Sequence, residues 1–141
     1  MGATLKISLR RLQGAQFEAT NPQGQSCVID GPADVGGLGQ GMRPMEMVLV
    51  GLAGCSAVDV LHILQKGRHG VEDLDIEVEG ERADAVPAVF TKIHLRFVAS
   101  GDFDEAKLVR AAQLSMDKYC SVVRMLAPTV EFTHEVALKP R

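Results

Sequence analysis

The sequence predicts an α+β fold in one domain, with a strand meander, a long central helix and a second set of strands and helices. Three observations lead to this prediction. Several short segments alternate apolar and polar residues, which is typical of half-buried strands. One long and largely apolar segment follows a proline, which favours a buried helix. The chain has 141 residues, 46% of them hydrophobic and 23% charged, as expected for a single globular domain spanning residues 1–141.

The first thirty residues predict three strands of an antiparallel meander, because apolar and polar residues alternate in short segments. The strands are expected at 4–12, 15–20 and 26–30, with a turn at "NPQGQ". A glycine-rich loop follows at 31–43. This loop lacks the Lys-Ser/Thr pair of a phosphate-binding loop and the G-x-G-x-x-G spacing, so we expect a flexible connection to the helix.

The central helix is expected to begin at Pro44 and to end near Lys66, where "GRHG" terminates it. At 1.5 Å per residue it is about 34 Å long. Between Glu46 and Asp59 it is apolar all round, so it should be buried on most sides. Its uninterrupted apolar run is too short for a membrane span. One small domain has difficulty covering such a helix, and we therefore expect a homodimer with the helix at or near the interface.

The second half predicts a hairpin, a helix, a short helix and a final edge strand. The expected ranges, in that order, are 74–82 with 88–100, then 102–119, 120–127 and 129–138. The hairpin strands alternate strongly, and the turn between them contains Pro87. The longer helix has acidic residues in its first turn, and Asp102 or Asp104 is expected to open it.

Composition argues against several classes of partner. The net charge of -3 gives no attraction to nucleic acid or to an anionic membrane, and 4% aromatic residues offer little base-stacking surface. The N-terminus has no continuous apolar segment of the secretory type. Three widely spaced cysteines do not resemble a secreted disulfide framework, so we expect a cytoplasmic protein with reduced thiols. The cysteines and the four histidines lack metal-ligand spacing, and neither a metal nor a cofactor is expected.

The cysteines are the candidate reactive groups. Cys27 lies in a short apolar strand and is expected to be a packed thiol. Cys55 lies on the central helix; His62, two turns away, is too far for a direct hydrogen bond and is expected to anchor the core. Cys120 follows Lys118 and precedes a helix start, and both features favour a thiolate. Two such thiols suit a peroxidatic and resolving pair, in which a sulfenic acid condenses with the second thiol.

Two motifs add to this interpretation: "RPMEMVLVGLAGCSAVDV" at 43–60 and "DKYCSV" at 117–122. Together with the order of elements along nearly the whole chain, they resemble the OsmC-like branch of the OsmC/Ohr family (osmotically inducible protein C and organic hydroperoxide resistance proteins). The resemblance implies an OsmC-like fold, an intertwined homodimer with active sites at the subunit interface, and reduction of organic hydroperoxides without metal or flavin. By position, Cys55 matches the peroxidatic cysteine and Cys120 the resolving cysteine, with an external dithiol as reductant.

The family's active site also has a glutamate early in the long helix and an arginine from the N-terminal strands. Here Glu46 is separated from Pro44 by one residue, and in a regular helix it lies about 180° from Cys55. Arg10 and Arg11 are the candidates for the arginine. Two hypotheses remain open: a thiol peroxidase, and a non-catalytic dimer on the same fold that binds a hydrophobic ligand or senses redox state.

Overall fold

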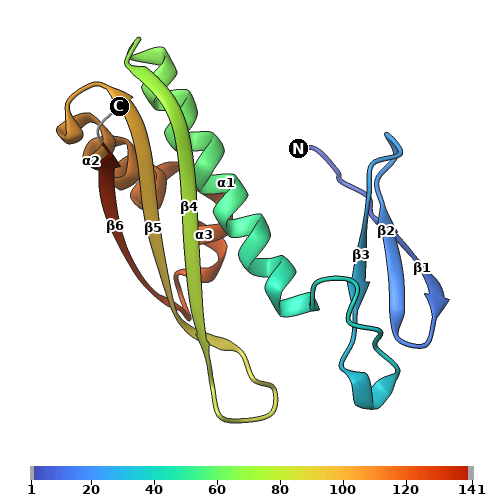
Figure 1. Cartoon of the computed structure of the whole chain (residues 1–141). Helices are drawn as coiled ribbons and strands as arrows, with labels where there is room; N and C mark the ends of the chain where they lie inside the picture. The colour runs from blue at the N-terminus through green and yellow to red at the C-terminus, as the bar shows by residue number, and fades with distance from the viewer. Residues whose placement is uncertain (1, 140–141) are drawn as a thin grey trace. The chain divides into compact units, whose positions relative to one another are not determined.

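The computed structural model describes residues 2–139 (Figure 1). The chain divides into two compact units, and the boundary between them falls in the long helix, between residues 48 and 49. The first unit holds three strands and a glycine-rich loop, and the second holds three strands and most of the helical residues. Strands and helices are both abundant, and the strands that follow one another closely in the chain pair side by side. The α+β fold class predicted from the sequence is therefore confirmed.

The first unit is the expected antiparallel meander. Strands β1 (Ser8–Gln13), β2 (Gln16–Thr20) and β3 (Ser26–Asp30) form one sheet in that order, and both pairs are antiparallel. A short 3₁₀ helix, η1 (Ala33–Val35), follows in the glycine-rich loop. Cys27 on β3 is exposed, so the prediction that it is a packed thiol is wrong. Its strand has a buried residue only at its last position, and the thiol lies outside that short buried segment.

The glycine-rich loop is tied to the sheet by one carboxylate. Asp30, 1% exposed, accepts hydrogen bonds from the backbone N–H groups of Leu38, Gln40 and Gly41. The bond from Leu38, followed by those from Gly41 and Gln40, lowers the pKa of Asp30 although burial opposes the shift. The loop that we expected to be a flexible connection is thus anchored by three backbone donors, because its glycines let the chain fold closely around the carboxylate.

The second unit is built on a three-stranded sheet. Strands β4 (Gly70–Arg82), β5 (Phe90–Asp102) and β6 (Glu131–Lys139) lie in that order. Strands β4 and β5 form the predicted antiparallel hairpin, with Pro87 in the connection, and β4 begins four residues earlier than its alternating pattern indicates. Strand β6 pairs with β5 in parallel and is an edge strand, as expected. Helices connect β5 to β6, as a parallel pair requires.

The helices follow the expected order with shorter limits in the second half. Helix α1 spans Pro44–Lys66, as predicted. Helix α2 (Glu105–Leu114) begins after Asp104, whose side chain caps it, and continues into a π-helix, η2 (Ser115–Tyr119). Helix α3 (Ser121–Leu126) is the short helix before β6. Asp104 therefore opens α2, whereas the alternative, the residue two positions earlier, ends β5.

Helix α1 buries one face rather than most of its surface. Leu52, Ser56, Val60 and Leu64 are each 0% exposed and follow one another at four-residue intervals. Val58, on another side, is 67% exposed. By length and composition alone α1 could also cross a membrane, a criterion that core helices of soluble proteins meet as well. The expected burial on most sides is wrong for the single chain, since the second unit supplies packing partners for one face only.

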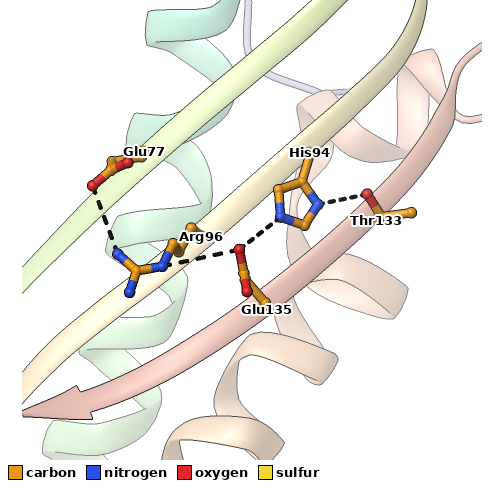
Figure 2. A network of polar contacts seen from close by, with 5 residues as sticks. All are labelled: Glu77, His94, Arg96, Thr133 and Glu135. Carbon is orange, nitrogen blue, oxygen red and sulfur yellow. Dashed lines mark hydrogen bonds and ion pairs between the residues drawn. The ribbon is translucent and has the colours of Figure 1, made fainter.

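The exposed face of the second sheet carries a polar network (Figure 2). The His94 imidazole contacts Thr133 Oγ1 at 2.6 Å and Glu135 Oε1 at 3.1 Å. Arg96 lies 3.9 Å from the same Glu135 and 3.7 Å from Glu77, so the network joins all three strands. Exposed ion pairs of this kind contribute little to stability, about 0–1 kcal/mol each. The helices lie behind the strands in Figure 2, so the network marks the side of the sheet away from the core.

Candidate active site

The second unit brings together the two cysteines that the sequence singles out. Cys55 lies in the middle of α1, and Cys120 is the residue that precedes α3. Their Sγ atoms and a carboxylate oxygen of Asp59 all lie within 4.8 Å of one another, and both thiols are free. A pair of thiols separated by 65 residues in sequence is therefore assembled within one chain.

Local structure explains this placement. Asp59 is one helical turn after Cys55, so the two side chains lie on neighbouring positions of the same face of α1. The Ser115 hydroxyl donates a 2.9 Å hydrogen bond to Asp59 Oδ2 and ties the π-helix to α1. The backbone N–H of Cys120 in turn bonds to the Ser115 carbonyl at 2.8 Å. Ser115 thus holds both the carboxylate and the second cysteine.

Sequence reasoning missed Asp59 and Ser115 as members of the site. The spacing of Asp59 from Cys55 was visible in the sequence and could have indicated a shared helix face. Nothing in the sequence indicates that Ser115 reaches α1, because its position depends on a wide π-turn that periodicity does not reveal.

The electrostatics of Cys120 are dominated by burial. This residue is 2% exposed, and burial raises the pKa of its thiol. The nearby Ser56 hydroxyl and the backbone N–H of Val123 act to lower the pKa, and the neighbouring Cys55 acts to raise it. The net effect is that the pKa of the Cys120 thiol lies above its ordinary value.

This outcome differs from the prediction that Lys118 and a helix start favour the Cys120 thiolate. The Lys118 ammonium lies over the ring of Tyr119, 5.3 Å from its centroid. Helix α3 has only six residues, so its dipole is small. Burial of the sulfur outweighs both features.

A cavity of about 550 Å³ adjoins the thiol pair through Asp59. His62 lines it and is exposed, so the prediction that this histidine anchors the core is wrong. The side of α1 that carries His62 lines the cavity instead of the core. The residues that line the cavity are Asp59, His62, Ile63, Lys66, Gly67, Leu114 and Tyr119.

The other predicted site residues belong to the first unit and have local partners there. Glu46 Oε1 accepts a 2.8 Å hydrogen bond from the backbone N–H of Arg43, which is the capping interaction of a third helical residue. Arg10 forms a 3.5 Å ion pair with Glu18, and Arg11 donates to a backbone carbonyl three residues later. A contribution of Glu46, Arg10 or Arg11 to the thiol site stays a prediction.

The chain is thus an α+β protein in which a long helix places one free thiol close to a second that precedes a short helix. A family model described as OsmC-like protein matches residues 37–135. The chain therefore belongs to the OsmC-like family, as its two motifs predicted.

Individual relatives support this assignment over almost the full chain. Protein YhfA of Escherichia coli strain K12 is 38% identical over 131 residues, covering 92% of this chain and 95% of YhfA. A hypothetical protein from Aquifex aeolicus VF5 is 31% identical, with a TM-score of 0.87 and coverage of 99% of both chains. The organic hydroperoxide resistance protein OhrB of Bacillus subtilis is 19% identical with a TM-score of 0.61, covering 97% of this chain and 98% of its own, and shares the fold.

Proposed function

We propose that the protein is a thiol peroxidase that reduces organic hydroperoxides. The observation that carries this proposal is the proximity of two free thiols, with the sulfur atoms of Cys55 and Cys120 within 4.8 Å. A disulfide needs an S–S distance of about 2.05 Å, so a local shift of the two side chains closes the gap. The name of the distant structural relative OhrB, an organic hydroperoxide resistance protein, supports the substrate class.

In the proposed reaction, the Cys55 thiolate attacks the terminal peroxide oxygen. An S–O bond forms, the O–O bond breaks, and the departing alkoxide takes a proton to become the alcohol. Cys120 then attacks the Cys55 sulfenic acid, the disulfide forms and water leaves. An external dithiol restores both thiols by thiol–disulfide exchange.

Exposure and pKa support the division of roles between the two thiols. Cys55 is partly exposed, whereas Cys120 is buried and its pKa is raised by that burial. A peroxide arriving from solvent meets Cys55 first, and the protonated Cys120 is protected from direct oxidation, since the thiolate is the reactive form.

The proposed active form is a homodimer in the cytoplasm. The exposed apolar surface of the single chain supports the dimer. Nothing lies within 4 Å of a Cβ built on Gly51 or Gly54, so this side of α1 is open to close approach by another backbone. Val58 of the same helix is 67% exposed. Sedimentation velocity at micromolar concentration should give the mass of two chains, and a stable monomer of 15.2 kDa would contradict the dimer.

The peroxidase proposal is tested by intact-mass measurement after adding one equivalent of cumene hydroperoxide to the reduced protein. We expect rapid loss of two hydrogens in the wild type, and a trapped sulfenate in Cys120→Ser. Cys55→Ser should lose turnover. Cys27→Ser is the matched control, because this thiol is exposed and lies in the other unit.

Oxidation of the wild-type thiols no faster than that of free cysteine would overturn the proposal. That result would favour the alternative, a dimer that binds a hydrophobic ligand without catalysis, for which the cavity of about 550 Å³ beside Asp59 is the observation in support. Unchanged turnover in Cys55→Ser would equally exclude the assigned nucleophile.

A further inference from the structure

A carboxylate beside the two thiols gives this site a second chemistry. The Cys55 and Cys120 sulfurs and an Asp59 oxygen converge within 4.8 Å, and each group is negatively charged when it ionises. Like charges this close disfavour one another's ionisation. A cation bound between the three groups relieves this repulsion, so the same arrangement suits cation binding.

The three donors match the requirements of a thiophilic divalent metal ion. Zinc binds thiolate sulfur at about 2.3 Å and carboxylate oxygen at about 2.0–2.2 Å, with tetrahedral geometry. Those bond lengths separate neighbouring ligand atoms by about 3.6–3.8 Å. With the three atoms of this site within 4.8 Å of one another, side-chain adjustments of roughly 1 Å suffice to bring them to these separations.

Surrounding groups support ligation as well. Ser115, 0% exposed, donates to one oxygen of Asp59 and leaves the other oxygen available, the arrangement that orients carboxylate ligands at metal sites. The Ser56 hydroxyl is fully buried and has no hydrogen-bond partner among the described residues, and a metal-bound Cys120 sulfur would accept a hydrogen bond from it. Asp59 also lines the cavity, which gives an ion a route of entry and room for a water ligand.

We propose that the reduced protein binds one divalent cation of the Zn²⁺ type through Cys55, Asp59 and Cys120, and that the bound ion blocks reaction of both thiols with peroxide. The blocking rests on the proposed peroxidase function, whereas the binding does not. Ligation engages the sulfur lone pairs that would attack the peroxide. The disulfide form has lost both thiolate ligands and should bind the ion weakly.

The test is a calorimetric titration of the reduced full-length protein with zinc chloride, in the absence of peroxide. We expect one ion per chain, no binding in Cys55→Ser and Cys120→Ser, and unchanged binding in Cys27→Ser. Asp59→Asn should weaken the affinity by at least roughly 10–100-fold, the range known for loss of groups that only support a ligand. Cadmium used in place of zinc should give the ultraviolet charge-transfer band of metal thiolates.

One further measurement and the choice of variant keep the outcomes distinct. Circular dichroism establishes that each variant is folded. The Asp59→Asn variant preserves the side-chain shape, so it tests the carboxylate even if the serine replacements of the two cysteines perturb the core. No binding by the wild type, or equal affinity in Asp59→Asn, would overturn the proposed site. A protein that binds zinc but does not reduce peroxide when zinc-free would overturn the peroxidase proposal alone. A protein whose peroxide reduction is unchanged by saturating zinc would overturn the metal proposal alone.

Discussion

Replacing Ser56 with alanine should raise the pKa of the Cys120 thiol and slow disulfide formation. The Ser56 hydroxyl is 0% exposed and lacks a partner of good geometry among the described residues. Burial raises the pKa of Cys120, and the nearby Ser56 hydroxyl opposes this shift. When the thiol ionises, the hydroxyl gains an acceptor that it otherwise lacks, so its removal disfavours only the thiolate.

The size of the effect follows from the strength of a hydrogen bond to a charged group, about 1.5–3 kcal/mol. Because the Ser56 hydroxyl makes no hydrogen bond within the described residues while the thiol is protonated, we expect the lower end of this range, about 1.5 kcal/mol. Since about 1.4 kcal/mol corresponds to a factor of ten, Ser56→Ala should reduce the Cys120 thiolate population roughly tenfold at any pH below its pKa. The free energy of unfolding should change little at neutral pH, because the protonated thiol does not depend on this bond.

The assay is a pH titration of the cysteine Cβ chemical shifts by carbon NMR, in the Cys27→Ser background. It reports each remaining thiol without the need for reagent access to a buried sulfur. Ser121→Ala is the matched control, because Ser121 is exposed and directly follows Cys120. The single-turnover rate of disulfide formation after sulfenate formation should fall with the thiolate population.

A Cys120 titration midpoint that stays constant or moves to lower pH in Ser56→Ala would refute the reasoning. It would mean that the hydroxyl does not stabilise the thiolate. An equal upward shift in Ser121→Ala would also refute it, since the effect would then come from general disturbance around the short helix.

Three further predictions concern stability and are checked by denaturant unfolding at a series of pH values. Asp30 has a lowered pKa in the folded state, so its stabilisation is present above the unfolded value of 3.8 and is lost as pH falls through the folded value; Asp30→Asn should flatten this acid dependence. Burial lowers the pKa of His134, so stability should decrease as pH falls below the unfolded value of 6.5, and His134→Gln should lose that slope. Leu64→Ala removes a fully buried side chain and should cost about 2–5 kcal/mol, whereas an equal loss in Val109→Ala, an exposed helical control, would contradict the burial of Leu64 as the cause.

The sequence predicted most of the elements because their signals are local. Alternation located the strands, and the proline at residue 44 and the glycine at residue 67 marked both ends of the long helix. The errors arose where a longer-range interaction decided the outcome. The glycine-rich loop is anchored rather than free because Asp30, which precedes it, accepts three of its backbone donors.

The candidate site likewise contains residues that the sequence identified and residues that only tertiary contacts bring into the site. Cys55 and Cys120 were identified from residue type, position in the predicted helices and the two family motifs. Asp59 and Ser115 were missed as site residues, because their hydrogen bond joins segments that are 56 residues apart. The roles of Glu46, Arg10 and Arg11 stay predictions, since the described contacts of these side chains are local to the first unit.

By itself, the sequence determined the α+β class, the order of the elements and the two cysteines, because periodicity, capping residues and residue chemistry are written along the chain. Only the tertiary structure decided which groups surround the two thiols. Burial of the Cys120 sulfur opposes the thiolate that its flanking residues favour, and a carboxylate one turn from Cys55 makes the pair a candidate cation site. Desolvation and close approach depend on what surrounds an atom in three dimensions, and no local pattern specifies that.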